Sequence, residues 1–207
     1  MISKLHYISQ GNTVDEQLYN IQRTLDNGCD WIQLRFKNGN TEEVKTVAEQ
    51  TKQLCQQYKA TFIINDKVDL AYQINADGVH LGLDDMRIKD ARSILGDRKI
   101  IGGTANTFEH VLQRANEKCD YIGLGPFRFT VTKEKLSPIL GLEGYKIILN
   151  KMNKQHVEIP LIAIGGILLD DIDSLIETGL HGIAVSGLLS QNPLLTTTLN
   201  EKLYVNI

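Results

Sequence analysis

Residues 100–124 read IIGGTANTFEHVLQRANEKCDYIGL, and this stretch decides the fold. It opens on a β-rich run at Ile100 and closes on a second one that ends at Leu124. Between the two runs, Val111, Leu112 and Ala115 recur at the three-to-four-residue spacing of an amphipathic helix. A strand, a helix and a strand in this order are typical of a parallel β-α-β unit.

The same unit recurs along the chain, where eight β-rich runs are each followed by a helical pattern, the weakest after Pro193. An open doubly wound sheet and a closed (β/α)8 barrel both fit strict alternation. Eight units favour the barrel, and the first run is not followed by the glycine-rich fingerprint of dinucleotide-binding sheets. No linker marks a second domain, so we predict one α/β domain, a (β/α)8 TIM barrel over residues 1–207. The predicted strands are residues 5–8, 31–35, 62–65, 78–81, 100–102, 121–124, 161–164 and 182–185.

Composition places the chain among ordinary globular proteins. Of its 207 residues, 42% are apolar and 23% charged, so the chain can bury a sizeable core. The net charge of −3 gives no general attraction to nucleic acid or anionic membrane, and we predict neither as a partner. No apolar run approaches the roughly 18–20 residues of a membrane span. Cys29, Cys55 and Cys119 form no CxxC pair, which is typical of free thiols in a reducing cytoplasm.

In a barrel of this kind, chemistry belongs to the loops that follow the strands. The second predicted strand ends in QLRFK, and period-two alternation places Gln33, Arg35 and Lys37 on one face. Leu34 and Phe36 then lie on the other face. Two cations and an amide at the barrel mouth suit a substrate that carries phosphate. The alternative is that both cations simply emerge into solvent at a strand end.

Acidic residues follow the next two strands. Asn65-Asp66 ends the third strand, and Asp84-Asp85 comes shortly after the fourth. Carboxylates from neighbouring loops can hold Mg²⁺, which completes its shell with water and substrate phosphates. Each aspartate taken alone is more typical of a helix N-cap. The basic loop next door favours the metal.

Small and hydroxyl-bearing residues follow the remaining strands. Residues 102–106 read GGTAN and offer backbone amides to an anion, and Thr130, Thr132 and Lys133 lie in a loop long enough to close over a site. Glycines follow the seventh and eighth strands, where many barrels bind phosphate. The histidines show no metal-ligand spacing, and His6 and His80 either enter the mouth or pack inside the barrel.

Six motifs in order resemble the family of thiamine-phosphate synthases and thiazole tautomerases. Each follows the expected strand, and together they span most of the chain. They are QLRFK at 33–37, INDKVDLA at 64–71, ADGVHLGLDD at 76–85, IGGTANT at 101–107, TVTK at 130–133 and AIGGI at 163–167.

The resemblance implies an enzyme that joins 4-amino-5-hydroxymethyl-2-methylpyrimidine diphosphate to a thiazole phosphate, with release of diphosphate. It implies Mg²⁺ on Asp66 and Asp85 and the pyrimidine near Gln33. The diphosphate would meet Arg35, Lys37, Asn65, Thr104 and Lys133, of which Arg35, Thr104 and Lys133 would be catalytic. The thiazole side would meet Thr130 and Thr132, and its phosphate would rest on Gly166, Val185 and Ser186.

The residues agree with this chemistry because no Ser/His/Asp set is visible, and a substrate that ionises to a pyrimidine cation needs no protein nucleophile. A thiazole tautomerase and a catalytically silent phosphate-binding module are the alternatives, and Asp66, Asp85 and Lys133 favour the synthase. Arg128-Phe129 stands where the family commonly has Phe-Pro. From the sequence, Arg128 could contact either the substrate or a flanking acid. Copies of the chain could form a homo-oligomer, which the sequence neither demands nor excludes.

Overall fold

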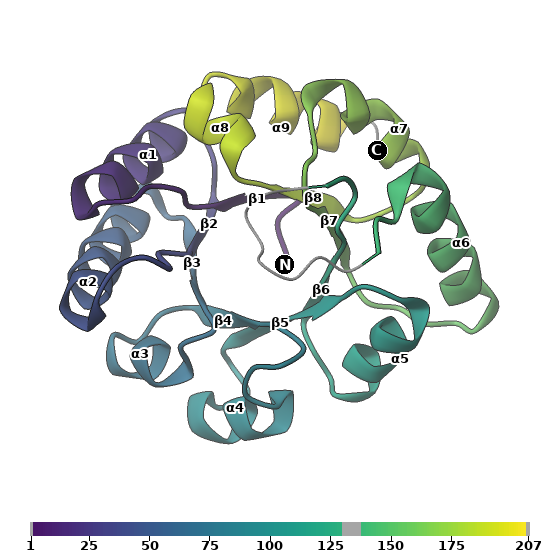
Figure 1. Cartoon of the computed structure of the whole chain (residues 1–207), viewed down its shortest axis with the longest axis horizontal. Helices are drawn as coiled ribbons and strands as arrows, with labels where there is room; N and C mark the ends of the chain where they lie inside the picture. Colours follow the sequence, from purple (N-terminus) through teal and green to yellow (C-terminus); the bar gives the residue numbers. More distant parts are fainter. Residues whose placement is uncertain (1, 130–137, 206–207) are drawn as a thin grey trace.

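The computed structural model describes residues 2–129 and 138–205, and it shows a closed barrel of eight parallel strands inside a ring of helices (Figure 1). The barrel closes where β1 pairs with β8, with His6 opposite Ala184. The predicted TIM barrel is therefore confirmed. The strands are β1 Leu5–Ile8, β2 Trp31–Leu34, β3 Thr61–Asn65, β4 Gly78–Leu81, β5 Ile100–Ala105, β6 Tyr121–Leu124, β7 Leu161–Ile164 and β8 Gly182–Val185.

The helices follow the strands as the alternation predicted, with one addition near the end of the chain. The helix α8 precedes Pro193 and was not predicted, because five residues are too few to show helical periodicity. The helices are α1 Val14–Asp26, α2 Thr41–Tyr58, α3 Val68–Gln73, α4 Ile88–Leu95, α5 Phe108–Asn116, α6 Gly141–Lys154, α7 Ile172–Glu177, α8 Gly187–Gln191 and α9 Leu195–Val205, with a 3-10 turn η1 at Leu169–Asp171.

Local sequence explains why the first two helices begin where they do. The Thr13 hydroxyl accepts a hydrogen bond from the Glu16 amide at the start of α1. At the start of α2, Asn40 and Glu43 exchange side-chain and backbone hydrogen bonds in a full capping box. Such caps satisfy amides that have no partner inside the helix. The helices can then pack their apolar faces against the outside of the barrel.

The barrel interior is filled by aromatic rings, and glycines make room for them. His6 stacks on Trp31 with ring centroids 3.9 Å apart, so His6 packs inside the barrel. A Cβ atom on Gly102 would lie 2.1 Å from the Tyr121 ring, so only glycine fits there. Gly103 belongs to β5 as well. The expectation that these two glycines form an anion-binding loop is wrong, since they serve strand pairing and packing.

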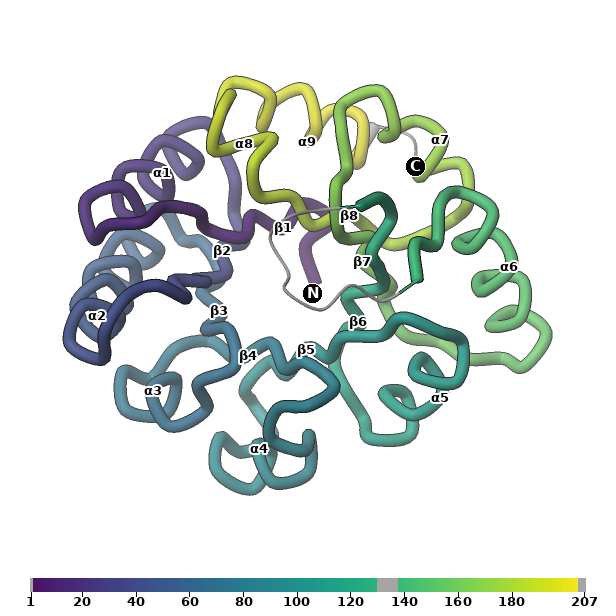
Figure 2. The backbone as a smooth tube through the Cα atoms, in the orientation of Figure 1, coloured from purple at the N-terminus to yellow at the C-terminus, as the bar shows by residue number. Residues whose placement is uncertain are grey.

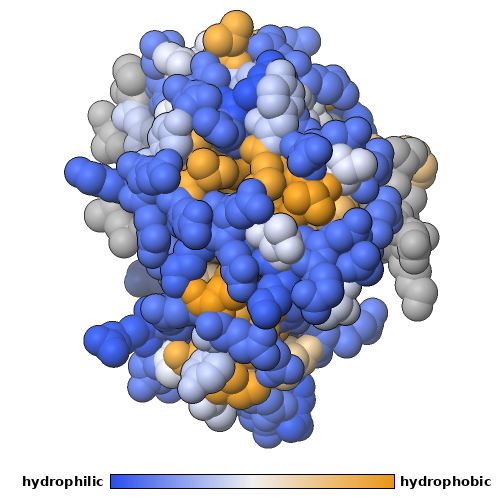
Figure 3. Space-filling model, turned by 90° about the vertical axis from the view of Figure 1, so that its left-hand side faces the viewer, coloured by the Kyte–Doolittle hydropathy of each residue, from blue (hydrophilic) through white to orange (hydrophobic). Residues whose placement is uncertain are grey.

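The tube in Figure 2 follows the chain out of each strand, through its helix and back into the next strand. All eight strand pairs are parallel, so the carboxyl ends of the strands all lie at the same end of the barrel, which we call its mouth. The face seen in Figure 3 is mainly hydrophilic, with apolar areas at several places. Within residues 2–129 and 138–205, no helix is long and apolar enough to span a membrane.

Candidate active site

Two predicted binding amides meet directly at the barrel mouth. Gln33 lies in β2 and Asn65 ends the adjacent strand β3. The Gln33 Nε2 group donates a hydrogen bond to Asn65 Oδ1 at 2.7 Å, and the Gln33 side chain is buried. The predicted alternation is confirmed within β2, where Leu34 packs in the core outside the barrel and Trp31 packs inside it. The strand ends at Leu34, so Arg35 and Lys37 lie in the loop that follows it. The hydrogen bond to Asn65 holds the free Oε1 face of Gln33 in a fixed orientation.

The cations that follow β2 lie beside an acid from β3. The amide of Arg35 donates to the Ser9 hydroxyl at 2.9 Å, which ties the end of β2 to the end of β1. Burial lowers the pKa of the half-buried Arg35, and the charge of Asp66 opposes that effect. Lys37 is exposed but also acts on Asp66 through its charge. Arg35 therefore does not simply emerge into solvent, as the alternative interpretation had it.

The structure brings Asp66 and Asp85 together from two different loops. Burial raises the pKa of Asp66 to about 6, and a hydrogen bond and the charge of Asp85 add to the effect. The Asp85 carboxylate also accepts a hydrogen bond from the Gly82 amide at 2.6 Å. Neither aspartate caps a helix, because α3 and α4 begin after Lys67 and Arg87. The capping alternative is wrong for both residues.

This carboxylate pair suits a divalent cation. Two carboxylates this close share a proton unless a positive charge comes between them. Among the residues that the structure describes, no group of three metal-ligating side chains exists. Two carboxylate ligands with water and substrate oxygens in the remaining positions match the preference of Mg²⁺. Asp66 and Asp85 therefore fit the predicted metal.

The predicted diphosphate contact Thr104 is held by a residue whose role the sequence left open. His80 Nε2 and the Thr104 hydroxyl form a hydrogen bond at 3.0 Å, and His80 Nδ1 and the Tyr121 hydroxyl form another at 3.0 Å. All three side chains are buried. The alternation of β4 could have predicted that His80 points into the barrel. Its hydrogen bonds to residues of two other strands are tertiary contacts, which a local pattern does not predict.

The glycine of the predicted phosphate site lies close to its partners on the next strand. Gly166 follows β7, and Val185 ends β8, which pairs with β7. Ser186 follows β8 directly. Gly166 has a left-handed backbone, with φ of 69°, that suits glycine. Ser186 is half-buried and its carbonyl begins the short helix α8. The three predicted residues are thus neighbours at one side of the mouth.

Arg128 contacts a flanking acid. Its guanidinium donates to both carboxylate oxygens of Asp171, at 2.7 and 2.9 Å, and to the Gly166 carbonyl at 2.6 Å. Thr130, Thr132 and Lys133 lie outside the described residues, and their assignments stay predictions.

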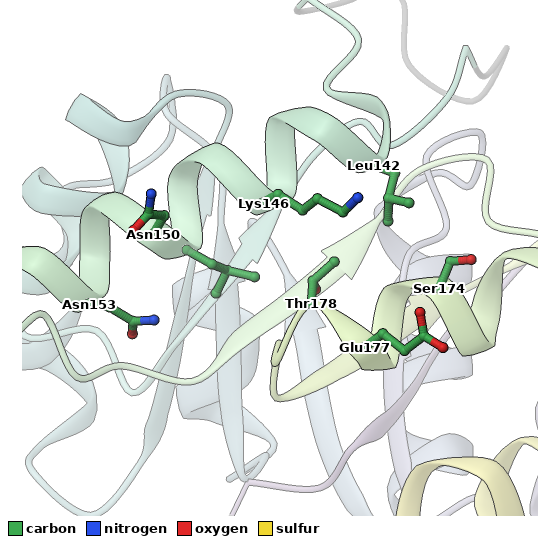
Figure 4. Close-up of a pocket in the computed structure, with 8 residues that line it drawn as sticks. Leu142, Lys146, Asn150, Asn153, Ser174, Glu177 and Thr178 are labelled. Carbon is green, nitrogen blue, oxygen red and sulfur yellow. The ribbon is translucent and has the colours of Figure 1, made fainter.

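A groove of about 390 Å³ lies elsewhere, on the outer flank of the barrel between α6 and α7 (Figure 4). Lys146 from α6 and Glu177 from α7 are among the residues that line it. It contains none of the predicted site residues. The candidate site is therefore the mouth of the barrel, and the groove is a separate feature.

A closed parallel barrel with an acidic pair, neighbouring cations and a glycine turn at its mouth is typical of (β/α)8 enzymes that act on small molecules. Residues 5–189 match the family described as thiamine monophosphate synthase, and the chain belongs to that family.

Relatives and a solved structure agree with this membership. The chain is 62% identical to the thiamine-phosphate synthase of Flavobacterium psychrophilum, over 98% of this chain and all of the relative. It is 60% identical to the thiamine-phosphate synthase of Flavobacterium johnsoniae, over 100% of this chain and 99% of the relative. The structure of thiamine phosphate pyrophosphorylase from Pyrococcus furiosus is similar with a TM-score of 0.81 and 32% identity, covering 97% of this chain and 93% of that one.

Proposed function

We propose that this chain is a transferase that joins 4-amino-5-hydroxymethyl-2-methylpyrimidine diphosphate to a thiazole phosphate, giving thiamine phosphate and diphosphate. The observation that carries the proposal is the Asp66–Asp85 pair beside Arg35 and Lys37. This juxtaposition offers a cation site next to two positive charges. A departing diphosphate needs both kinds of stabilisation.

The β2–β4 side of the mouth would bind the pyrimidine diphosphate. Gln33 gives one N–H to Asn65 and keeps its carbonyl oxygen for a donor such as the amino group of the pyrimidine. Arg35 and Lys37 would contact the diphosphate oxygens, and so would Thr104 from the neighbouring strand β5. Mg²⁺ on Asp66 and Asp85 would neutralise charge on the leaving group when bound.

The chemistry asks for electrostatic stabilisation and positioning. The amino group of the pyrimidine can stabilise a benzylic-type cation, so the C–O bond can break before the thiazole nitrogen attacks. The protein then needs no nucleophile. The cysteines agree with this, because burial raises the pKa of Cys29 and of Cys119 to about 12 and keeps both thiols protonated.

The β6–β8 side of the mouth would hold the thiazole phosphate. Its phosphate would rest on Gly166 and on the backbone of Val185 and Ser186. Thr130 and Thr132 would lie on the same side of the substrate, and Lys133 would reach the diphosphate. These three residues enter the proposal through the family motif alone.

Three buried, free cysteines support a reducing compartment, and we infer a cytoplasmic enzyme. Nothing in the proposed reaction requires a protein partner or a second copy of the chain.

The decisive experiment measures diphosphate release from both substrates with and without Mg²⁺, with the product identified by mass. We expect thiamine phosphate only when metal is present. Asp66→Ala should abolish most turnover, whereas Asp84→Ala, an exposed neighbour of Asp85, should keep it. An isomerised thiazole without coupling would show a tautomerase, and binding of both substrates without turnover would show a silent module. Either result would overturn the proposal.

A further inference from the structure

The segment after β6 lies directly against the turn after β7. The Phe127 amide donates to the Ile164 carbonyl and the Arg128 amide to the Gly165 carbonyl, each at 2.9 Å. A Cβ atom on Gly166 would lie 3.0 Å from the Cβ of Arg128. The two backbones are therefore in contact at this point, and a movement of one segment displaces the other.

One ion pair links the two ends of this turn. Arg128 Nη1 donates to the Gly166 carbonyl at 2.6 Å and to Asp171 Oδ2 at 2.7 Å, while Nη2 donates to Asp171 Oδ1 at 2.9 Å. The same Asp171 carboxylate accepts from the Leu168 amide at 2.8 Å. Arg128 thus fixes the carbonyl of Gly166, and Asp171 fixes the amide of Leu168. Only the planar fork of an arginine makes all three contacts.

The pair is neutral as a unit, which argues against Arg128 as a ligand of an anion. The Asp171 side chain is 14% exposed and the Arg128 side chain 43%. The hydrogen bond from Arg128 lowers the pKa of Asp171, so the carboxylate is charged at neutral pH. A phosphate that bound the guanidinium would leave this carboxylate unpaired and largely covered by protein, which is unfavourable.

We propose that Arg128 and Asp171 are positioning residues that hold the Gly166–Leu168 turn in the conformation that receives the phosphate of the thiazole substrate. The inference rests on the proposed placement of that phosphate on Gly166. The C=O and N–H of a trans peptide point in opposite directions, so a fixed Gly166 carbonyl also fixes the direction of the Ile167 N–H. Donors that are fixed before binding cost no reorganisation when the anion arrives.

The test is a steady-state analysis of Asp171→Asn and Arg128→Lys in which the KM for each substrate is measured separately. We expect the KM for thiazole phosphate to rise about tenfold in both variants, the scale of one lost charge-assisted hydrogen bond. The KM for pyrimidine diphosphate should change less than about twofold, because that substrate binds the other side of the mouth.

The matched control is Asp173→Asn, which removes the exposed ion pair with Lys202 in the same helical region. It should leave both KM values unchanged. Circular dichroism melting of every variant establishes that the protein folds. A rise of both KM values in parallel would overturn the proposal, and so would a lower KM for thiazole phosphate in Asp171→Asn, because that result would show the released Arg128 binding the phosphate itself.

Gly166→Ala separates this inference from the proposed function. If the wild-type protein makes thiamine phosphate and Gly166→Ala raises the KM for thiazole phosphate while the two ion-pair variants do not, the positioning role alone is overturned. If Gly166→Ala leaves that KM unchanged in an active enzyme, the phosphate lies elsewhere and the positioning role falls with it. Absence of coupling in the wild-type protein would overturn the proposed function.

Discussion

The two sides of the barrel mouth are built by different means. On the β2–β4 side, side chains form the site: burial and the neighbouring Asp85 raise the pKa of Asp66, and the charge of Arg35 opposes this effect. On the β6–β8 side, backbone forms the site, and the ion pair between Arg128 and Asp171 stabilises the conformation of a turn. On the first side, the repulsion between Asp66 and Asp85 is unfavourable, and a bound cation can relieve it. On the second side, the charged groups already have their hydrogen-bond partners before any ligand binds.

The difference predicts how each side responds to substitution. Removing a side chain from the β2–β4 side removes chemistry, because those groups would contact the leaving group. Disturbing the β6–β8 side displaces a binding surface, so it should change affinity for one substrate more than the rate of the chemical step.

The largest effect is expected on the β2–β4 side. Asp66→Ala should lower kcat by about 10²–10³-fold, the loss of roughly 3–4 kcal/mol seen when one preorganised contact to a developing charge is removed. Lys133→Ala should behave alike, since it would contact the same diphosphate. Diphosphate release under saturating substrates measures the effect, with circular dichroism to show a retained fold. Normal kcat in either variant would contradict the assignment.

A smaller effect is expected from Gly166→Ala on the other side. Gly166 has a left-handed φ of 69°, and a methyl group there would lie only 3.0 Å from Arg128 Cβ and from the Phe129 carbonyl, so both neighbours would have to move slightly. We expect about 1–3 kcal/mol of lost stability from backbone strain, together with a raised KM for thiazole phosphate. Gly179→Ala is the matched control, because Gly179 has φ of 83° with nothing within 4 Å. It should lose stability without any change in KM.

The fold was predictable from the sequence because barrel strands and helices are local patterns. Each strand was found within a few residues, except that β5 continues to Ala105. There Gly102 and Gly103 look like a loop, and their role as space for Tyr121 and Arg114 depends on side chains from other elements. The five-residue α8 was missed for lack of length.

The site was predictable where one strand carries it, as in the alternation that placed Gln33 and Arg35 at the mouth. The pairing of Asp66 with Asp85 followed from adjacent strands. The contacts of His80 with Thr104 and Tyr121, and of Arg128 with Asp171, join residues 24 to 43 positions apart in the chain. A local sequence pattern cannot predict contacts between residues so far apart in the chain. These groups come together only through the register of the closed barrel.

Tyr121→Phe tests whether the barrel interior supports the β2–β4 side. The substitution leaves His80 Nδ1 without its hydroxyl partner, and we expect about 1–2 kcal/mol of lost stability. If His80 acts on the reaction through Thr104, kcat should also fall, and the fall should disappear in a Thr104→Ala background. A double-mutant cycle on kcat measures this coupling. Additive effects would show that Tyr121 and Thr104 act independently.

The smallest effect is a pH dependence that belongs to the unfavourable charges of the β2–β4 side. The pKa of Asp66 is raised by burial and by Asp85, from 3.8 to about 6. The folded protein therefore holds a proton that the unfolded chain has released, and metal-free stability should fall as pH rises from about 4 to about 6. The loss should be on the order of 1 kcal/mol, since Asp66 is partly exposed and solvent screens its interactions. Urea unfolding at several pH values measures this loss.

The control is Asp66→Asn, which should remove the dependence of stability on pH. Without metal at pH 7 this variant should be more stable than the wild type, although it should be inactive. Mg²⁺ should stabilise only the wild type. An unchanged slope in Asp66→Asn would show that other groups cause the pH dependence of stability. The proposed contrast between the two sides of the mouth would then lose its electrostatic basis.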